Sequence, residues 1–300
     1  MNDALVQSIF TERKLKTSSA QEKHIENLRQ PMRKIWSAYR NDAVKIDYSE
    51  QSTQEAYLLR YFLPYAYTLK SVLEQSQWQP NQDNALLEVC LLGCGPAPEL
   101  LGIMCHLQQQ PQAPQMLLAH FVDIAADTWR YGQRIAQRAF LADQWDTALL
   151  DTTSTKVDLC STDLLANKKL SEKIANSQLI VVQNCLNETK DITILDNLLG
   201  IMSIMRTDAH LLIVDRAGYY PKTKQCFQFI DLAASYNHYH KKGSDSVFYT
   251  MQINNTCSSK IRNKLLYANT PTTLENDGLI LGNKVKHNWR LIRKSAQGIK

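Results

Sequence analysis

The sequence predicts an α/β fold, an open and mostly parallel sheet with helices on both faces, behind an N-terminal helical extension. Short apolar runs at 86–92, 116–122, 156–160, 178–182 and 210–214 alternate with helical stretches. This alternation is typical of buried parallel strands joined by crossover helices. Polar residues follow most of these runs. Because ligands of such sheets bind at the carboxyl ends of the strands, the polar residues predict a ligand site at one edge.

The first expected strand, 86–92, leads into a turn that contains Gly93 and Gly95. Glycines let a backbone approach a ligand closely, and the N-terminus of the helix that follows attracts an anion. The second expected strand ends at Asp123, whose carboxylate could accept hydrogen bonds from both hydroxyls of a ribose. The pattern therefore predicts a nucleoside site. The simpler alternative is an ordinary turn of an α/β protein.

The residues after the second glycine argue against a dinucleotide. The dinucleotide fingerprint has a third glycine, where helix and strand pack closely, and it seats a pyrophosphate on the helix. This chain has Pro98 at that position and Glu99 beside it. A carboxylate would repel a pyrophosphate but suits a ligand with an ammonium group. S-adenosylmethionine (SAM), an adenosine joined to a zwitterionic amino acid, is such a ligand, and NAD is the alternative.

These residues resemble the first motif of the class I SAM-dependent methyltransferases, a strand that ends in G-x-G followed by an acidic residue. The resemblance implies a Rossmann-like methyltransferase sheet with SAM as cofactor. In that family an aspartate and an apolar residue after the third strand contact the adenine, which implies Asp163 and Leu164 in this chain. Asp158 is the alternative to Asp163 for this contact. The cofactor contacts implied are Gly93, Cys94, Gly95, Pro96, Glu99, Asp123, Ile124, Asp163, Leu164 and Asn184.

The chain divides into a helical extension or lid, residues 1–80, and a SAM-binding domain, residues 81–300. Two further strands are expected at 246–253 and 288–293. In the resembled fold the sheet ends in an antiparallel hairpin, which these two strands could form. The residues between them, 254–285, are more than a hairpin needs and are expected to form an insertion.

One helix of the extension carries tyrosines at the spacing of a single helix face, Tyr57, Tyr61 and Tyr65. Pro64 should kink or end this helix. The tyrosines could simply pack the helix onto the sheet domain. In the alternative, Tyr57, Arg60 and Tyr61 form a lid over the cofactor pocket.

Candidate catalytic residues follow the fourth expected strand. Asn184 and Asn187 could hydrogen-bond a methyl acceptor, and Glu188 could take a proton from an imide or a hydroxyl. The alternative is that Asn187 and Glu188 only begin and cap the next helix. The Asn-Pro-Pro-Tyr sequence of many methyltransferases that act on nucleic-acid amino groups is absent, which argues against that acceptor.

A narrower resemblance points to RNA. Segments 54–67, 92–99, 186–188 and 212–218 look like those of fungal-type enzymes that methylate 25S ribosomal RNA at uridine N3. This resemblance spans residues 52–220 and implies an RNA substrate. Two alternatives stay open. One is a small-molecule N- or O-methyltransferase, and the other is a non-catalytic assembly factor with a SAM-binding fold.

Composition sets the remaining expectations. The 300 residues are 44% hydrophobic and 21% charged, as in ordinary globular proteins, and no signal peptide or membrane-length apolar run is visible. Seven cysteines without a C-x-x-C pair indicate reduced thiols in a cytoplasmic, reducing compartment and no metal site. The net charge is +5. A basic cluster near the C-terminus could bind phosphates or be a solvated face: Lys284, Lys286, Arg290, Arg293, Lys294 and Lys300.

Overall fold

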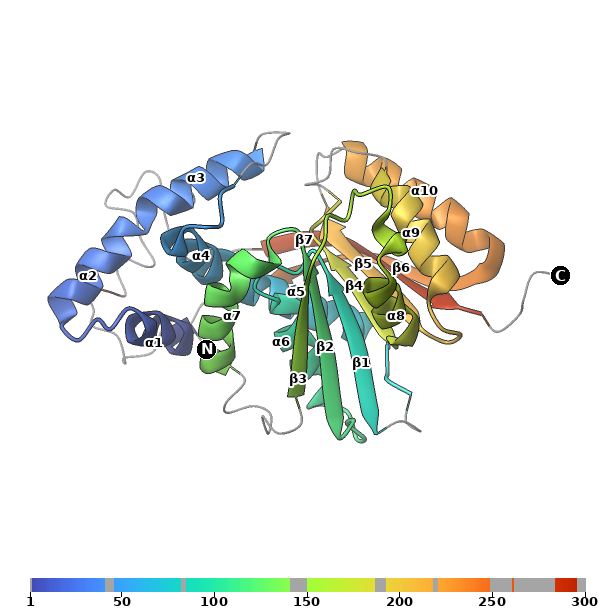
Figure 1. Ribbon diagram of the computed structural model, residues 1–300, viewed down its shortest axis with the longest axis horizontal. Helices are drawn as coiled ribbons and strands as arrows, with labels where there is room; N and C mark the ends of the chain where they lie inside the picture. The colour runs from blue at the N-terminus through green and yellow to red at the C-terminus, as the bar shows by residue number, and fades with distance from the viewer. Residues whose placement is uncertain are drawn as a thin grey trace.

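The computed structural model describes residues 2–40, 46–81, 85–140, 150–186, 193–217, 221–248, 261 and 284–295. Within these ranges a seven-stranded mixed sheet has the order β3-β2-β1-β4-β5-β7-β6 (Figure 1). Strands β1 to β5 are parallel, and β7 is antiparallel to both of its neighbours. The strands are β1 (Leu86–Leu92), β2 (Met116–Asp123), β3 (Leu150–Lys156), β4 (Leu179–Gln183), β5 (His210–Arg216), β6 (His238–Phe248) and β7 (Lys284–Lys294).

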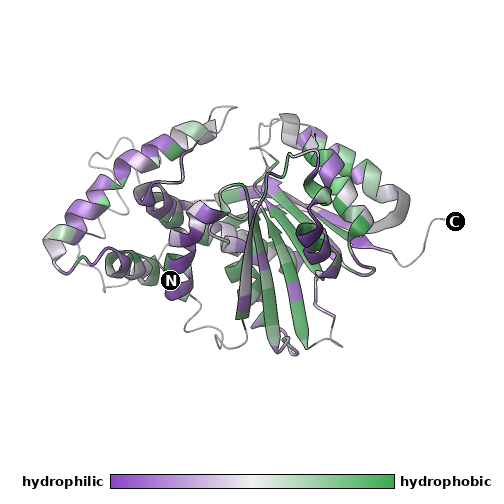
Figure 2. Ribbon diagram, in the orientation of Figure 1, coloured by the Kyte–Doolittle hydropathy of each residue, from purple (hydrophilic) through white to green (hydrophobic). Residues whose placement is uncertain are grey.

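Helices cover both faces of the sheet, as expected for a Rossmann-like methyltransferase fold. Alternate strand residues enter two separate cores, so Val89 packs with α5 and α6 whereas Cys90 packs with α8, α9 and α10. The central strands are mostly hydrophobic (Figure 2) because neighbours cover them on both faces. The helices on the two faces are α5 (Leu63–Gln75), α6 (Pro98–Leu107), α8 (Lys168–Asn176), α9 (Thr193–Ile204) and α10 (Pro221–Asn237).

Four of the five parallel strands lie where the sequence predicts them, and the third does not. The prediction of a strand at 156–160 is wrong, because β3 precedes it at Leu150–Lys156. β3 is the edge of the sheet, and its Thr-rich sequence is only half buried. An edge strand needs β-branched residues but no continuous apolar run. The apolar residues Val157 and Leu159 lie in the following loop and pack against the core.

The expected antiparallel pair is present, since β6 and β7 pair along their whole length. β6 begins at His238, well before the predicted 246. Most of the expected insertion at 254–285 lies outside the described residues. Its last two residues, Lys284 and Val285, belong to β7.

The N-terminal helices lie beside the sheet, next to α7 (Ala126–Phe140) (Figure 1). They are α1 (Asn2–Glu12), α2 (Ser18–Asn27), α3 (Arg29–Arg40) and α4 (Gln51–Tyr57), and α4 continues through the π-helix η1 (Leu58–Phe62) into α5. The division at residue 80 stays a prediction. No helix in the described ranges has the length and apolarity to cross a membrane.

Pro64 does not end the helix, which continues to Gln75. Proline has no N–H, and its ring clashes with the carbonyl group four residues earlier. The wider π-helical turn Leu58–Phe62 comes directly before this position and gives that carbonyl room. The tyrosine-bearing helix therefore passes from the extension onto the sheet without a break.

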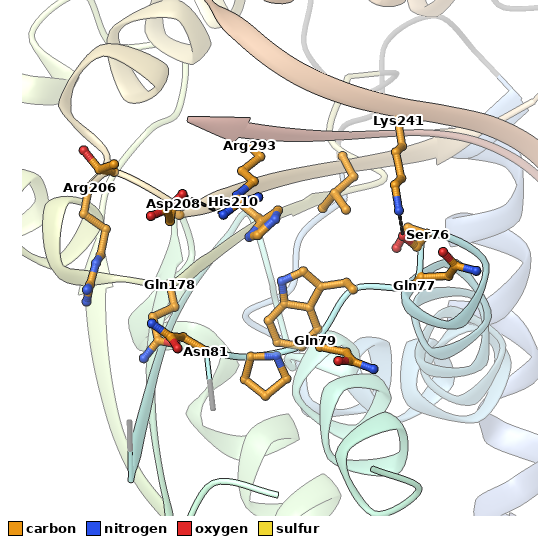
Figure 3. A pocket seen from close by; sticks show the side chains of 15 residues that line it. Ser76, Gln77, Gln79, Asn81, Gln178, Arg206, Asp208, His210, Lys241 and Arg293 are labelled. Carbon is orange, nitrogen blue, oxygen red and sulfur yellow. Dashed lines mark hydrogen bonds and ion pairs between the residues drawn. The ribbon is translucent and has the colours of Figure 1, made fainter. Parts of the chain in front are cut away.

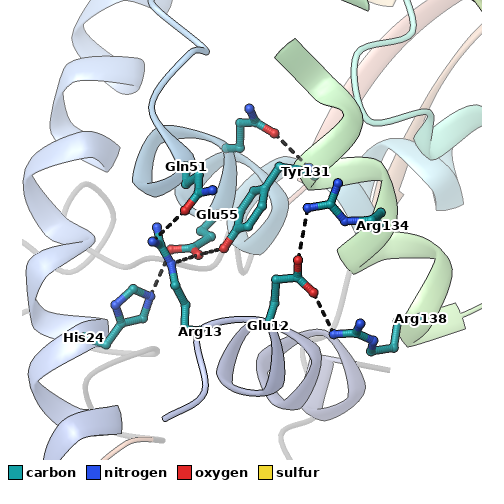
Figure 4. Close-up of polar contacts among 10 residues, drawn as sticks. Glu12, Arg13, His24, Gln51, Glu55, Tyr131, Arg134 and Arg138 are labelled. Atoms are coloured by element: carbon teal, nitrogen blue, oxygen red, sulfur yellow. Dashed lines mark hydrogen bonds and ion pairs between the residues drawn. The ribbon is translucent and has the colours of Figure 1, made fainter. Parts of the chain in front are cut away.

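A buried carboxylate joins the extension to α7 (Figure 4). Glu55 is fully buried, and its two oxygens accept hydrogen bonds from Arg13 Nε at 2.6 Å, from His24 Nε2 at 2.9 Å and from the Tyr131 hydroxyl. Burial alone would raise the pKa of Glu55, but these three partners outweigh it and hold the pKa below its usual value. The residues come from the turn after α1, from α2, from α4 and from α7, so this one side chain ties four segments together.

We expect Glu55→Gln to lower the free energy of unfolding at pH 7 by about 1.5–3 kcal/mol, because the buried side chain loses its charge-assisted hydrogen bonds from His24 and from the partly buried Arg13. The matched control is Glu12→Gln, whose partners Arg134 and Arg138 are about half exposed. The control should cost about 1 kcal/mol or less. Urea unfolding followed by circular dichroism measures both, and equal losses would contradict the role assigned to Glu55.

The pH dependence gives an independent measure of the same interaction. A folded-state pKa below the unfolded value means that the stabilisation is complete above the ordinary pKa of 4.5 and is lost as the pH falls through the folded value. The wild type should therefore lose more stability in acid than Glu55→Gln. If the free energies of unfolding of the two proteins change with pH in parallel, the lowered pKa of Glu55 is contradicted.

Candidate functional site

A cavity of about 440 Å³ opens at the carboxyl ends of β1, β2 and β4. The sheet supplies its floor, and the N-terminal helices supply tyrosines from the opposite side. The described residues that line it are Tyr39, Tyr48, Tyr57, Tyr65, Gly93, Cys94, Gly95, Glu99, Asp123, Ile124, Ala125, Trp129, Val157, Asp158, Leu159, Cys160, Gln183, Asn184 and Cys185. The cavity is therefore at the edge of the sheet where ligands of this architecture bind.

The glycine turn needs its glycines for two reasons. Gly93 and Gly95 have φ angles of +67° and +51°, which side chains disfavour. Space is also short: a Cβ on Gly93 would lie 2.3 Å from Cys185 Sγ, and one on Gly95 would lie 3.2 Å from the ring of Trp129. The turn consequently exposes bare backbone to the cavity.

Asp123 stands at the end of β2 and accepts backbone hydrogen bonds on both oxygens. Gly95 N–H donates to Oδ2 at 2.8 Å, and Ala125 N–H donates to Oδ1 at 2.7 Å. Burial raises the pKa of Asp123, and these two N–H groups work against that rise. Each carboxylate oxygen can accept more than one hydrogen bond, so Asp123 is oriented by the turn and still able to accept ligand hydroxyls.

Glu99 lies in the first turn of α6 and is only 4% exposed. Burial, reinforced by the nearby charge of Asp123, raises its pKa to about 8. Its Oε2 has no hydrogen-bond partner in the part of the chain that the structure describes, and neither has Oε1 of Gln183, which lines the same cavity. Two buried acceptors without donors make this part of the cavity suited to a cationic, N–H-rich group.

The structure brings together most of the predicted cofactor residues. Gly93, Cys94, Gly95, Glu99, Asp123, Ile124 and Asn184 line the cavity, as does Tyr57 of the expected lid. Pro96, Asp163, Leu164, Arg60 and Tyr61 are not among its lining residues. Asn187 and Glu188 lie outside the described residues. The cofactor and catalytic roles of all these residues stay predictions.

The two candidate aspartates for the adenine contact lie differently, because the third strand ends earlier than predicted. Asp158 lines the cavity, whereas the Asp163 carboxylate is exposed and accepts a hydrogen bond from the Ser161 hydroxyl. Leu164 is 2% exposed and packs into the core beneath α8 and α9. The arrangement therefore favours the rival, Asp158.

Sequence reasoning missed an aromatic wall. The ring of Trp129, from α7, lies 4.4 Å from that of Tyr48 and 5.3 Å from that of Tyr57, between centroids. Tyr39 and Tyr65 extend the wall. The helical spacing of Tyr57 and Tyr65 was visible in the sequence, but Tyr39, Tyr48 and Trp129 come from other segments and belong to no motif, so only the folded chain reveals that they join the same wall. Flat apolar walls suit planar ligands.

A second cavity, of about 410 Å³, lies at the opposite edge of the sheet (Figure 3). Gln178 and His210, at the starts of β4 and β5, contribute to its lining, and Arg293 pairs with Asp208 at 2.7 Å beside them. It has no glycine turn, and the amino ends of parallel strands are not the usual ligand edge. The chemistry is therefore assigned to the first cavity. Among the described residues, no group of three His, Cys, Asp or Glu could hold a metal ion.

No protein-family model matches this chain, and no curated protein matches it. Solved methyltransferase structures do resemble it. An O-methyltransferase family protein from Burkholderia thailandensis is 8% identical, with a TM-score of 0.47, over 94% of this chain and 72% of its own. Magnesium protoporphyrin IX methyltransferase from Synechocystis PCC 6803 was solved with bound SAM. It is 12% identical, with a TM-score of 0.42, over 76% of this chain and 79% of its own.

Precorrin-6y C5,15-methyltransferase from Geobacter metallireducens GS-15 is 9% identical, with a TM-score of 0.40, over 75% of this chain and 87% of its own. None of these three proteins is a fungal-type ribosomal RNA uridine methyltransferase, so the narrower resemblance gains no support from them. Likenesses at TM-scores below 0.5 carry no argument about function. The function proposed below depends on the residues of the site.

The raised pKa of Glu99 predicts how stability changes with pH in the ligand-free protein. Between its ordinary pKa of 4.5 and about 8 the unfolded chain ionises at this residue while the folded protein stays protonated, so stability is lost as the pH rises. Glu99→Gln removes that loss, which is on the order of a few kcal/mol. In thermal unfolding, we expect the melting temperature of Glu99→Gln to rise relative to that of the wild type as the pH increases from 4.5 to 8. Asp127→Asn, a substitution at an exposed carboxylate, is the control and should show the same pH dependence as the wild type. If Glu99→Gln also shows that dependence, the raised pKa assigned to Glu99 is wrong.

Proposed function

We propose that this protein is a SAM-dependent methyltransferase. The observation that carries the proposal is one cavity that contains the oriented carboxylate of Asp123, the bare glycine turn and the unpartnered carboxyl group of Glu99. Asp123 suits the two hydroxyls of a ribose. Glu99, with Gln183 nearby in the lining, suits the ammonium group of an amino acid, and binding a cation there would favour the ionised carboxylate.

The alternative cofactor, NAD, fits less well. No Lys or Arg from the described ranges lines the cavity. A pyrophosphate would instead meet the buried carboxyl group of Glu99 at the N-terminal turn of α6, where burial already disfavours further negative charge. The residues that would hold the adenine of SAM are Ile124, Asp158 and Leu159, which line the same cavity.

When bound, SAM supplies a methyl group whose bond to the sulfonium sulfur breaks, leaving the electron pair on sulfur, as the bond to the acceptor forms. The protein contributes alignment of the two reactants and exclusion of water. The aromatic wall of Tyr48, Tyr57 and Trp129 would restrict the reactants to one plane of approach. Asn187 and Glu188 remain our candidates for holding the acceptor and taking its proton.

For the acceptor we propose a small molecule, with RNA as the alternative. Three of the six residues of the basic cluster near the C-terminus make contacts within the protein. Arg290 Nη2 donates to Asp231 at 2.9 Å, Arg293 pairs with Asp208, and Lys294 Nζ donates to the Met205 carbonyl at 2.7 Å. Together with a cavity lining free of Lys and Arg in the described ranges, this leaves little charge for a phosphate backbone. The free cysteines among the described residues agree with a reducing, cytoplasmic compartment, which we also propose.

Calorimetric titration with SAM and with S-adenosylhomocysteine tests the cofactor. Asp123→Ala should weaken binding by about 1–3 kcal/mol, because charge-assisted bonds to the ribose are lost. Gly95→Arg should abolish binding, since its side chain would fill the space beside Trp129. Asp127→Ala, an exposed change on neighbouring α7, is the control. Wild-type affinity in Asp123→Ala or Gly95→Arg, or tight binding of NAD, would rule out the proposal.

Transfer of tritiated methyl groups from SAM, offered total RNA and a metabolite extract side by side, tests the acceptor. We expect label in the small-molecule fraction. Glu188→Gln should lower the rate by roughly 10²-fold or more and leave SAM binding unchanged if Glu188 is the base. Label confined to RNA would replace our acceptor with the alternative. SAM binding without any transfer would point to the assembly-factor alternative.

A further inference from the structure

Arg216 lies at the carboxyl end of β5. In the sheet, β5 is the neighbour of β4, whose end lines the cavity. In the order β2-β1-β4-β5, it lies on the side away from Asp123, across about 14 Å of sheet at the usual strand spacing. Gln183 and Asn184, at the end of neighbouring β4, line the cavity between them. Arg216 is not itself a lining residue, but its strand position puts it next to the part of the cavity lined by Gln183 and Asn184, on the side away from the proposed ribose contact.

Three tyrosines surround the Arg216 guanidinium. Its central carbon lies 5.4 Å from the ring centroid of Tyr39 and 5.6 Å from those of Tyr61 and Tyr65. One terminal N–H group also donates to the Tyr65 hydroxyl. We call Tyr39, Tyr61 and Tyr65 the tyrosine cage. A guanidinium is stabilised by aromatic faces, but aromatic faces do not neutralise its charge.

No carboxylate pairs with Arg216 among the described residues. The adjacent acid, Asp215, is fully buried, and its oxygens accept backbone N–H groups from Arg216 at 2.7 Å and from Leu186 at 2.9 Å. Apart from the bond to Tyr65, the guanidinium N–H groups have no acceptor in the described ranges. The other partly buried arginines differ: Arg13 pairs with Glu55, and Arg290 pairs with Asp231.

The tyrosine cage connects this charge to the cavity. Tyr39 and Tyr65 contact Arg216 on one side and line the cavity on the other. Arg216 itself is partly exposed at the edge of that wall. An anion that enters between the two rings could reach the planar edge of the guanidinium, which binds carboxylate and phosphate oxygens through paired N–H donors.

Resting on the methyltransferase function proposed above, we infer that Arg216 and the tyrosine cage form an anion subsite for the methyl acceptor. The acceptor is then a small, flat molecule that carries a carboxylate or phosphate group. The aromatic wall contacts its ring, and Arg216 binds its anionic group. The subsite selects and positions the acceptor, and it has no direct part in binding the cofactor.

Benzoate and phenyl phosphate are suitable probes because each joins a flat ring to one anionic group, and benzamide is their uncharged counterpart. Ligand-observed NMR titrations would measure each probe on the full-length protein saturated with S-adenosylhomocysteine. We expect benzoate or phenyl phosphate to bind at least tenfold more tightly than benzamide. The tighter of the two identifies the anion as a carboxylate or a phosphate.

Arg216→Met should weaken the anionic probe at least tenfold and leave benzamide and S-adenosylhomocysteine within twofold of the wild type. Arg216→Lys keeps the charge but loses the planar pair of donors, so its affinity for the anionic probe should lie between those of the wild type and Arg216→Met. Arg206→Met removes an equal charge at the opposite edge of the sheet, where it lines the second cavity, and should behave as the wild type.

Equal wild-type binding of benzoate, phenyl phosphate and benzamide, or no binding by either anion, would overturn the subsite. So would an Arg216→Met protein that binds the anion as tightly as the wild type. If Arg216→Met does not fold, the wild-type comparison and Arg216→Lys still decide. If S-adenosylhomocysteine does not bind, the methyltransferase proposal fails, and the same probes on the cofactor-free protein still report on Arg216.

Discussion

The hydrogen bond from the Gly95 backbone to the buried carboxylate of Asp123 is the contact on which the site depends. It joins the turn after β1 to the end of β2, so two strands that are adjacent in the sheet present one continuous polar edge. The bond is possible only because both glycines of the turn adopt positive φ angles, and because Cys185 and Trp129 pack where Cβ atoms would be. Sheet pairing, turn geometry and ligand chemistry are thus set by one local arrangement.

Titratable groups without an ionic partner among the described residues gather in and beside the cavity. Burial raises the pKa values of Asp123 and Glu99, which line it, and Arg216 lies beside it among tyrosines, with no carboxylate partner in the described ranges. The buried carboxylate of Glu55, by contrast, is paired with Arg13 and His24. Unpaired groups lower the stability of the empty protein, and a ligand of opposite charge recovers that energy on binding. Asp123 and Glu99 line the cavity and Arg216 lies beside it, behind the lining residues Tyr39 and Tyr65, as a site for two reactants requires.

The N-terminal extension completes the site and does more than cover it. Tyr39, Tyr48 and Tyr57 supply much of the aromatic wall, and all precede the first strand. Their positions depend on the bonds of the extension to α7, made by Glu55 to Tyr131 and by the Gln54 amide to Gly132 N–H and the Thr128 carbonyl. The cavity therefore draws its lining from both sides of the predicted division at residue 80. Neither part carries the whole cavity.

The sequence alone determined what depends on neighbours along the chain: the apolar runs of β1, β2, β4 and β5, the glycine turn, and the carboxylates Glu99 and Asp123 that follow it. Local periodicity and turn chemistry carry that information. Only the tertiary structure decided the edge strand β3, the position of Asp158 rather than Asp163 at the cavity, the meeting of Trp129 with Tyr48 and Tyr57, and the cage around Arg216. Those features join residues that are distant in the chain, Tyr65 and Arg216 among them, and no local pattern records which distant side chains will meet.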